Sequence, residues 1–332
     1  MKRFAVLGLF LLAAATATSA QEPRTLVVTS SNNAAGNQLL VYDATGALVQ
    51  TAATNGLGGV SGNAGGIGAS EQLVAVVNFG SQSVSVFDIV STGLQLRQVI
   101  STLSAPVSVA FDKDHLYVLG TTSVESHRIH GTEVEVAADG SAALSVGDGS
   151  SAQVCVVADR LLISEKSNIV ETVALRAGAV SGITESVPLP AGSDTPLGLA
   201  TRGENGYVTI AHSDEVALVK NGQTVALTGS GTQHAPCWVT LVGQFLFSSN
   251  TPSHSVSRYV VTGTQVVLDL DVVATTAGGP SDIASSGRML AVLDSGAQTH
   301  LTQFSVDEDG NLQQVAVSVL NKGANGVAII QR

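Results

Sequence analysis

The chain has 332 residues and a formal net charge of −11; 44% of its residues are hydrophobic and only 12% are charged. Because Lys and Arg contacts to phosphate supply most nucleic-acid affinity, this acidic balance excludes a nucleic-acid-binding role and argues against anionic membrane surfaces. The hydrophobic content is high enough to predict a packed core rather than a disordered chain.

The first twenty residues have the layout of a secretory signal peptide. Lys2 and Arg3 form a basic start, residues 4–15 are almost wholly apolar, and the small residues 18–20 precede an expected cleavage before Gln21. The apolar stretch is shorter than the roughly 20 residues of a membrane-spanning helix, which makes an uncleaved anchor the less favoured alternative. We therefore expect a secreted or periplasmic protein without a membrane anchor.

Seven short apolar strands then follow, each preceded by a small residue or proline. The steps between these anchor positions are 42, 46, 44, 40, 44 and 45 residues. A constant period of roughly 40–50 residues made of short strands is typical of a β-propeller. The anchors are Ala64, Pro106, Ala152, Pro196, Pro236, Pro280 and Asn325.

Each repeat contains four candidate strands. After Pro106 these are residues 107–111, 115–120, 123–129 and 132–138, and the same order recurs after Pro236. A Gly-centred turn separates the third and fourth strands, as expected for tight hairpins that need a positive φ. Alternating polarity with many Val, Ser and Thr residues fits half-buried strands.

The two ends of the chain complete the ring. The strands of residues 25–53 lack an anchor strand before them, and the strand after Asn325 has nothing behind it. We predict that these two pieces share one blade, which removes the exposed edges of an open sheet. The expected fold is an all-β, seven-bladed propeller of four-stranded blades, a single domain from residue 24 to residue 332. A six-bladed ring, the alternative, would leave one strand unpaired.

Two features resemble a known group of propellers. The segment VVNFGSQSVSVFDI (76–89) is similar to the YVTN-type repeat. The order of segments such as LLISEKSNIVETV (161–173) and HAPCWV (234–239) resembles exported seven-bladed propellers of the lactonase-like group, which includes the 6-phosphogluconolactonase and carboxymuconate cyclase families. The resemblance implies the propeller fold and a lactone-opening or lactone-forming activity, although one fold hosts many functions.

The positions that carry catalysis in that group differ here. Gln153 stands where the resemblance implies a His, residues 165–167 replace an Asp-Leu-Gly segment, and residues 194–197 lack an Arg-His pair. His212 occupies the place of a later Glu. Because a lactone site needs a carboxylate clamp and a proton-transfer group, these departures favour a binding or interaction scaffold without catalysis. The alternative is a lactonase- or cyclase-type enzyme for a sugar or carboxylated lactone, with a displaced site at the channel mouth.

Polar residues near the ends of the anchor or second strands are the site candidates. The competing interpretation is that they cap strands and satisfy turn backbone groups, and that the single Trp packs between blades. The catalytic candidates are His212, His234 and Glu165, the binding candidates are Lys166, Trp238 and Asp282, and the remaining members of this ring are Asp214, Asn250, His254 and Asp294.

The remaining motifs predict no cofactor and no metal. Cys155 and Cys237 lie in anchor strands with one whole repeat between them, too far across a channel for the Cα separation of about 5.5 Å that a disulfide needs. We expect two buried free thiols. The Gly-rich stretch 56–68 lacks the lysine and helix of a phosphate loop and is interpreted as a flexible link. The expected partner of this monomer is a small molecule or a protein at one propeller face.

Overall fold

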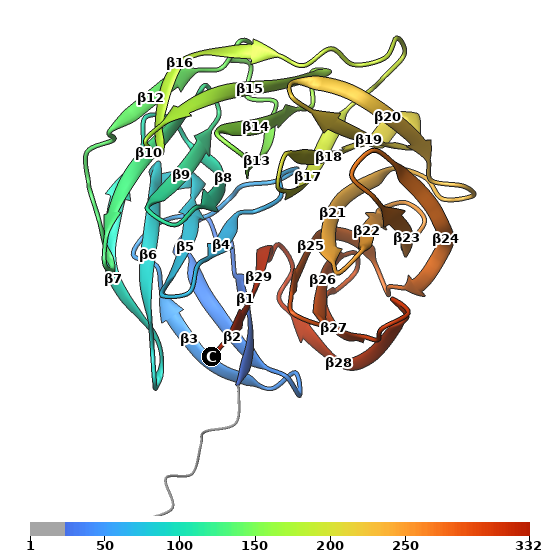
Figure 1. Cartoon of the computed structure of the whole chain (residues 1–332). Coiled ribbons are helices and arrows are strands. Elements are labelled where there is room, and N and C mark those ends of the chain that lie inside the picture. Colours follow the sequence, from blue (N-terminus) through green and yellow to red (C-terminus); the bar gives the residue numbers. More distant parts are fainter. Residues whose placement is uncertain (1–23) are drawn as a thin grey trace, which may run out of the picture.

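The computed structural model describes residues 24–332; the predicted signal peptide lies outside this range. Seven antiparallel sheets form a closed ring around a central channel (Figure 1). The predicted all-β, seven-bladed propeller is therefore confirmed. No helix of the described part is long and apolar enough to cross a membrane.

We number the blades in chain order. Blade 1 contains β29 with β1–β3, blade 2 β4–β7, blade 3 β8–β12, blade 4 β13–β16, blade 5 β17–β20, blade 6 β21–β24 and blade 7 β25–β28. Each innermost strand begins within three residues of a predicted anchor. Proline suits the first position of a strand, where its missing N–H costs no ladder hydrogen bond. The innermost strands are β29 (Asn325–Gln331), β4 (Ile67–Ala69), β8 (Pro106–Phe111), β13 (Ser151–Val157), β17 (Pro196–Arg202), β21 (Pro236–Val242) and β25 (Gly279–Ser286).

The second and third strands of each blade carry most of the core. The second strands are β1 (Thr25–Ser30), β5 (Leu73–Asn78), β9 (His115–Gly120), β14 (Arg160–Glu165), β18 (Asn205–Ile210), β22 (Phe245–Asn250) and β26 (Met289–Ser295). The third strands are β2 (Gln38–Asp43), β6 (Ser83–Val90), β10 (Ser123–His130), β15 (Ile169–Arg176), β19 (Glu215–Lys220), β23 (Ser255–Val261) and β27 (Thr299–Val306).

The outermost strands are more exposed, and two short 3₁₀ helices follow second strands. The outer strands are β3 (Leu48–Ala53), β7 (Gly93–Ser101), β11 (Glu133–Val134), β12 (Gly140–Ala143), β16 (Ala179–Ser186), β20 (Gln223–Gly229), β24 (Val266–Thr275) and β28 (Leu312–Leu320). The 3₁₀ helices are η1 (Phe79–Ser81) and η2 (Ala211–Ser213).

Blade 3 departs from the predicted four-strand pattern at its outer edge. The sequence predicts one fourth strand over residues 132–138, whereas the structure divides it into β11 and β12, both paired with β10. Between them, Asp139 turns inward, where its carboxylate accepts hydrogen bonds from Ser126 and His115. A buried polar network therefore interrupts the strand.

The ring closes as the two half-blades at the chain ends predict. β29 pairs antiparallel with β1, with Val28 opposite Ala328, and runs beside it in Figure 1. Ser30 adds a side-chain bond across this seam, because its hydroxyl donates to the carbonyl of Asn325 at 2.8 Å. The C-terminal strand thus becomes the innermost strand of blade 1.

The core lies between neighbouring blades rather than at the centre of the ring. Val84 of blade 2, Leu119 of blade 3 and Ile163 of blade 4 belong to one fully buried apolar cluster. Because burial of such side chains contributes about 1.5–3 kcal/mol each, every blade stabilises its neighbours. The channel at the centre of the ring holds a cavity lined by residues of the inner strands.

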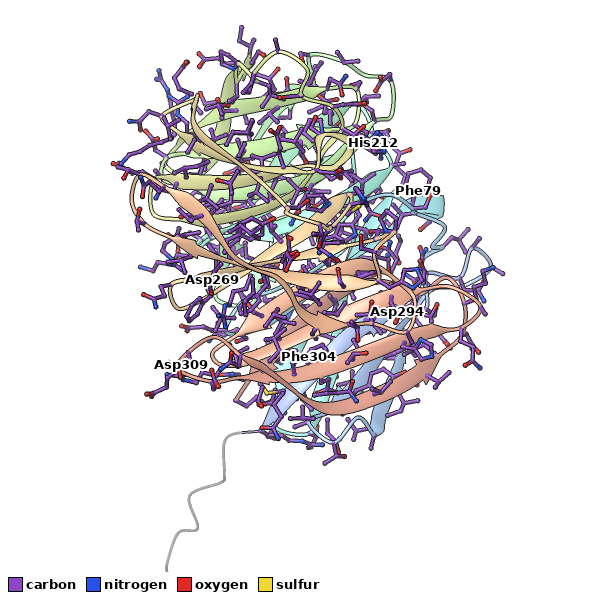
Figure 2. All side chains as sticks on the ribbon, turned by 90° about the vertical axis from the view of Figure 1, so that its right-hand side faces the viewer. Phe79, His212, Asp269, Asp294, Phe304 and Asp309 are labelled. Carbon is purple, nitrogen blue, oxygen red and sulfur yellow. The ribbon has the colours of Figure 1, made fainter. Side chains whose placement is uncertain are left out.

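The two faces of the ring differ in their connections. Inner strands begin and second strands end at one face, here called the mouth face, which carries η1 and η2. Figure 2 places Phe79, His212 and Asp294 toward this face, and Asp269 and Asp309 toward the other.

Candidate functional site

A cavity of about 610 Å³ opens at the mouth face, and we call it the mouth pocket. Its walls come from the starts of inner strands and from the turns that follow second strands. None of its lining residues in the described chain is acidic, although the protein as a whole carries a net charge of −11. The residues that shape it include Asn32, Asn63, Lys166, Thr195, Leu197, His212, Cys237, Trp238, Pro280 and Asn325.

The floor of the mouth pocket is the Gly-rich segment that leads into blade 2. Residues 59–65, here called the floor loop, run past blade 3 to blade 4: the carbonyl of Gly65 accepts from the amide of Val109 in blade 3 at 2.8 Å, and the amide of Ala64 donates to the carbonyl of Ala152 in blade 4 at 3.2 Å. Gly62 and Gly65 have φ of 65° and 63°, a region that glycine adopts without strain. The sequence interpretation of this stretch as a flexible link was wrong, because the segment is bonded to three blades.

Two asparagines fix the floor loop in place. Oδ1 of Asn32 accepts hydrogen bonds from the amides of Gly59 and Val60, at 2.7 and 3.0 Å, and its Nδ2 donates to the carbonyl of Val60. Asn63 forms a reciprocal amide pair with Asn325. Sequence reasoning missed both Asn32 and Asn63; only the Asn-Gly-rich composition of the stretch could have indicated turns with side-chain support.

Lys166 supplies the cation of the mouth pocket. Its Nζ donates to the carbonyl of Gly62 at 2.9 Å and lies 3.4 Å from that of Ser151, and it forms no ion pair with any described residue. Burial lowers the pKa of its ammonium, while the charge of Asp148 acts against that shift. A partly desolvated cation with a free N–H lies at the edge of the cavity.

Trp238 forms the main apolar wall. It is 5% exposed and belongs to a cluster with Ala64, Ala152 and Leu197, which come from the floor loop and from blades 4 and 5. The competing sequence interpretations, packing between blades and lining a site, therefore both describe this side chain. Cys237 lies beside it in the wall, and burial raises the pKa of its thiol. Cys237 and Cys155 are both free thiols.

The two candidate histidines have different environments. His212 lines the mouth pocket, and its Nδ1 lies 2.9 Å from the hydroxyl of Thr195. His234 does not line the pocket; its ring is exposed, and its Nδ1 lies 2.8 Å from Oδ2 of Asp214. The structure thus separates His234 from the pocket wall that Trp238 forms.

Glu165 and Asp282 are buried away from the mouth pocket. Glu165 is fully buried at the end of β14, where burial, followed by the charges of Glu171 and Asp148, raises its pKa to about 8. Asp282 faces a second cavity of about 370 Å³ further along the channel, and burial raises its pKa to about 7. Of the six named site candidates, Lys166, His212 and Trp238 come together and the other three do not.

Asp282 belongs to a series of inter-blade bridges along the channel. In each, a side-chain oxygen of one inner strand accepts the backbone amide of the next inner strand. The bridges are Ser108 from Val154 at 3.3 Å, Gln153 from Leu199 at 2.6 Å, and Asp282 from Val327 at 3.2 Å. These contacts align neighbouring blades.

The remaining ring members cap strands or bond inside their own blades, except Asp214 of blade 5, which accepts the amide of Ala235 just before β21 of blade 6. Asn250 and Asp294 are fully buried, Asn250 donating to Ser257 and Asp294 accepting from the amide of His300. His254 adopts a positive φ of 49° in a turn. Within residues 24–332, no group of three or more His, Cys, Asp or Glu side chains is placed to hold a metal ion.

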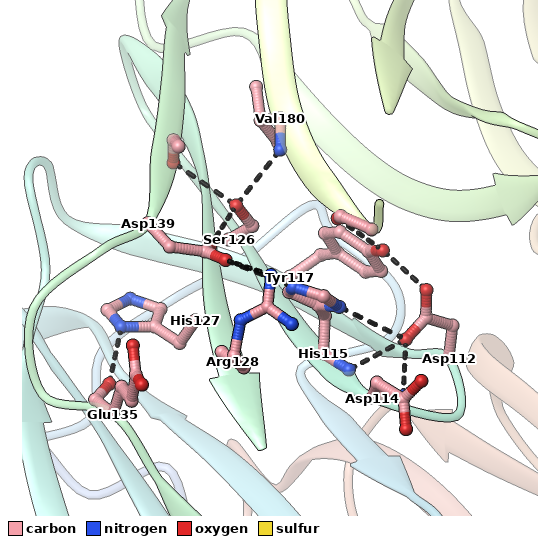
Figure 3. A network of polar contacts seen from close by, with 12 residues as sticks. Asp112, Asp114, His115, Tyr117, Ser126, His127, Arg128, Glu135, Asp139 and Val180 are labelled. Carbon is pink, nitrogen blue, oxygen red and sulfur yellow. Dashed lines mark hydrogen bonds and ion pairs between the residues drawn. The ribbon is translucent and has the colours of Figure 1, made fainter. Parts of the chain in front are cut away.

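A larger polar network lies outside the mouth pocket, in blade 3 (Figure 3). The buried ring of His115 lies with its Nε2 3.0 Å from Oδ2 of Asp139, and the hydroxyl of Tyr117 lies 2.6 Å from Oδ2 of Asp112 and 2.8 Å from the carbonyl of Gly178. Because Gly178 belongs to blade 4, the network joins two blades.

Comparisons with known proteins identify the fold. No family model and no curated protein sequence matches this chain. Among solved structures, a candidate 6-phosphogluconolactonase from Bacteroides fragilis is similar, with 15% identity, a TM-score of 0.71, and coverage of 94% of this chain and 99% of that one. A candidate 6-phosphogluconolactonase from Bacteroides uniformis has 16% identity, a TM-score of 0.70 and coverage of 93% and 100%. A protein from Lactobacillus plantarum has 14% identity, a TM-score of 0.66 and coverage of 93% and 99%.

These similarities extend over nearly the whole of each chain. The protein therefore has the fold of lactonase-like seven-bladed propellers, at a sequence identity that speaks for the fold alone. What it does must be argued from the mouth pocket.

Proposed function

We propose that this chain is an exported, non-catalytic binding propeller whose mouth pocket takes a small molecule with a carboxylate or phosphate group on a partly apolar body. One observation carries the proposal: in an acidic protein, the described residues that line the pocket include the cation Lys166 and no acidic side chain. An anion in the pocket is attracted by the Lys166 ammonium and is not repelled by a carboxylate of the described wall.

The chemistry of the lining fits such a ligand. Lys166 can donate a charge-assisted hydrogen bond, which is about twice as strong as a neutral one. Trp238 and Leu197 supply apolar wall, and the cavity of about 610 Å³ lies within the range of small-molecule sites. Of the two expected kinds of partner, a small molecule or a protein, the lining therefore favours a small molecule bound at the mouth face.

The lining favours binding over catalysis. Among the described residues, His212 is the only imidazole in the pocket wall, and its polar partners are Thr195 and Asp194 at the exposed rim. A proton-transfer site needs a base and an acid held close to the reacting atoms. Glu165, the third catalytic candidate, is fully buried behind the wall.

Calorimetric titration with matched ligands tests the proposal. One apolar or sugar-like body is offered as its carboxylate, its phosphate monoester and its neutral carboxamide. We expect the two anions to bind and the amide to bind at least tenfold more weakly, since loss of a charge-assisted bond costs more than about 1.4 kcal/mol.

Two variants test whether the preference for anions over the amide arises in the mouth pocket. Lys166→Met should abolish the preference for the anions, whereas Lys113→Met, which removes an exposed lysine elsewhere, should leave it unchanged. Equal binding of anion and amide, or an unaltered preference in Lys166→Met, would refute the anion site.

The fold neighbours favour one second candidate, a lactonase at the same pocket. Hydrolysis of sugar lactones and carboxylated lactones is then expected, lost in His212→Ala and retained in His234→Ala, because only His212 lines the cavity. No turnover above the His212→Ala background would exclude it.

A further inference from the structure

Two glutamates meet inside blade 4 without the donors that carboxylates need. Glu165 ends β14 and Glu171 lies on β15, where Glu165 pairs with Ile169 and Glu171 with Ile163, so the two are diagonal neighbours on one face. Both are 0% exposed. Neither oxygen of Glu165, and only Oε2 of Glu171, has a hydrogen-bond partner, the amide of Ser145.

The same diagonal in other blades shows what this position requires. In blade 2, Asn78 donates to the hydroxyl of Ser85 at 2.8 Å. In blade 6, Asn250 donates to the hydroxyl of Ser257 at 2.7 Å. The geometry therefore brings these two positions within hydrogen-bond reach, with the first one donating.

Blade 3 shows how the protein places a single carboxylate here. Glu125 occupies the second position of the diagonal and accepts from the amide of Leu103, while the first position is Gly120. No second carboxylate faces it across the diagonal. Only blade 4 puts an acid at both positions.

We propose that Glu165 and Glu171 share one proton, so that a carboxyl–carboxylate hydrogen bond takes the place of the Asn–Ser bond, and that loss of this proton at alkaline pH loosens the wall of the mouth pocket. Two unprotonated carboxylates in contact and out of water would lack any compensating charge. The wall is involved because Lys166, the residue after Glu165, anchors the floor loop through Gly62.

The other charged groups around the pair support a retained proton. Asp148, in the connection between β12 and β13, adds a negative charge that raises the pKa of Glu165, after burial and Glu171 itself. The Lys166 ammonium is directed to the carbonyls of Gly62 and Ser151 rather than to either glutamate.

The sign of the pH dependence follows from linkage. The pKa of Glu165 is about 8 in the folded chain and 4.5 as the ordinary value, so the folded state holds the proton more tightly. Its contribution to stability is complete below about pH 4.5 and is lost as the pH rises through about pH 8. Stability should therefore fall across this window.

Glu165→Gln tests the shared proton. The amide can donate to Glu171 as Asn78 and Asn250 donate to serines, and it cannot ionise. Thermal unfolding from about pH 5 to about pH 9 should show a smaller fall in midpoint for Glu165→Gln than for the wild type, and a higher midpoint at the alkaline end. Glu171→Gln should behave alike, and the exposed control Glu71→Gln should follow the wild type.

Infrared spectroscopy supplies a readout that a purely structural role would not move. At neutral pH the protonated carboxyl band of the wild type and of Glu71→Gln should lose intensity in Glu165→Gln and Glu171→Gln, and the part that remains belongs to Asp282, whose pKa is about 7. In the wild type, Trp238 emission should shift to longer wavelength at alkaline pH as the wall of the mouth pocket loosens. This shift should be absent in Glu165→Gln. An unchanged band with an unchanged pH profile in both variants, or a midpoint that depends on added calcium or sodium instead of pH, would overturn the proposal.

Discussion

Asn63 and Asn325 join distant parts of the sequence through a reciprocal amide pair. Nδ2 of Asn325 donates to Oδ1 of Asn63 at 3.0 Å, and Nδ2 of Asn63 donates back at 3.3 Å, across 262 residues of chain. Both side chains are buried, and Asn63 also donates to the carbonyl of Val107. The pair therefore fastens the closing strand β29 to the floor loop and to blade 3.

Asn63→Ala should destabilise the ring by about 1–3 kcal/mol, because it leaves the amide of Asn325 and the carbonyl of Val107 buried without partners. Urea unfolding measures the loss of free energy. Gln223→Ala, at an exposed position of β20, is the matched control and should cost no more than about 0.5 kcal/mol. Equal stabilities of the two variants would show that the amide pair does not hold the seam.

The ring could be predicted from the sequence because each blade repeats the same local sequence pattern. Anchors such as Pro106 and Pro236 begin inner strands, and Gly-centred turns begin outer ones. The split outer strand of blade 3 could not be predicted, since it depends on Asp139 meeting His115 from another strand. Local strand propensity carries no information about such a tertiary contact.

The candidate site could be predicted only in part. Lys166, His212 and Trp238 lie near strand ends at the mouth face, which the repeat locates. The floor loop could not be found in this way, because its role depends on long-range bonds from Asn32 and Lys166 to a segment without strand pattern. The isolation of His234 likewise reflects side-chain direction, which strand position alone does not determine.

Trp238 should act as a single fluorescent reporter of the mouth pocket, because it is the only tryptophan and is 5% exposed. We expect acrylamide to quench the native emission several-fold less than that of the urea-unfolded chain. An anionic ligand of the proposed class should reduce quenching further, and Lys166→Met should remove this protection. Native quenching as strong as in urea would contradict the buried wall described for this residue.

The two thiols should react slowly in the folded protein. Burial raises the pKa of Cys155 to about 12 and also raises that of Cys237, and only the thiolate is nucleophilic. A chromogenic disulfide reagent should therefore release two equivalents of chromophore per chain in denaturant without reductant, one for each thiol. Under native conditions it should release much less chromophore over the same time. Release of no thiol from the denatured, unreduced chain would reveal a disulfide and disprove the separation across the channel.

Gly178 and Gly182 offer a matched test of the blade 3 network in Figure 3. A Cβ on Gly178 would lie 2.1 Å from Nδ1 of His115, whereas a Cβ on Gly182 would meet no atom within 4 Å. Both glycines have a positive φ, 84° and 92°, so the backbone strain of an alanine is similar at the two positions.

Gly182→Ala should therefore cost about 1–2 kcal/mol from backbone strain alone. Gly178→Ala should cost a further 1–3 kcal/mol or so, because the ring of His115 is held by Asp139 at 3.0 Å and cannot move aside freely. Urea unfolding of the two variants gives the difference directly. If both variants lost the same free energy, the contact between the blade 4 hairpin and His115 would not contribute to the stability of the ring.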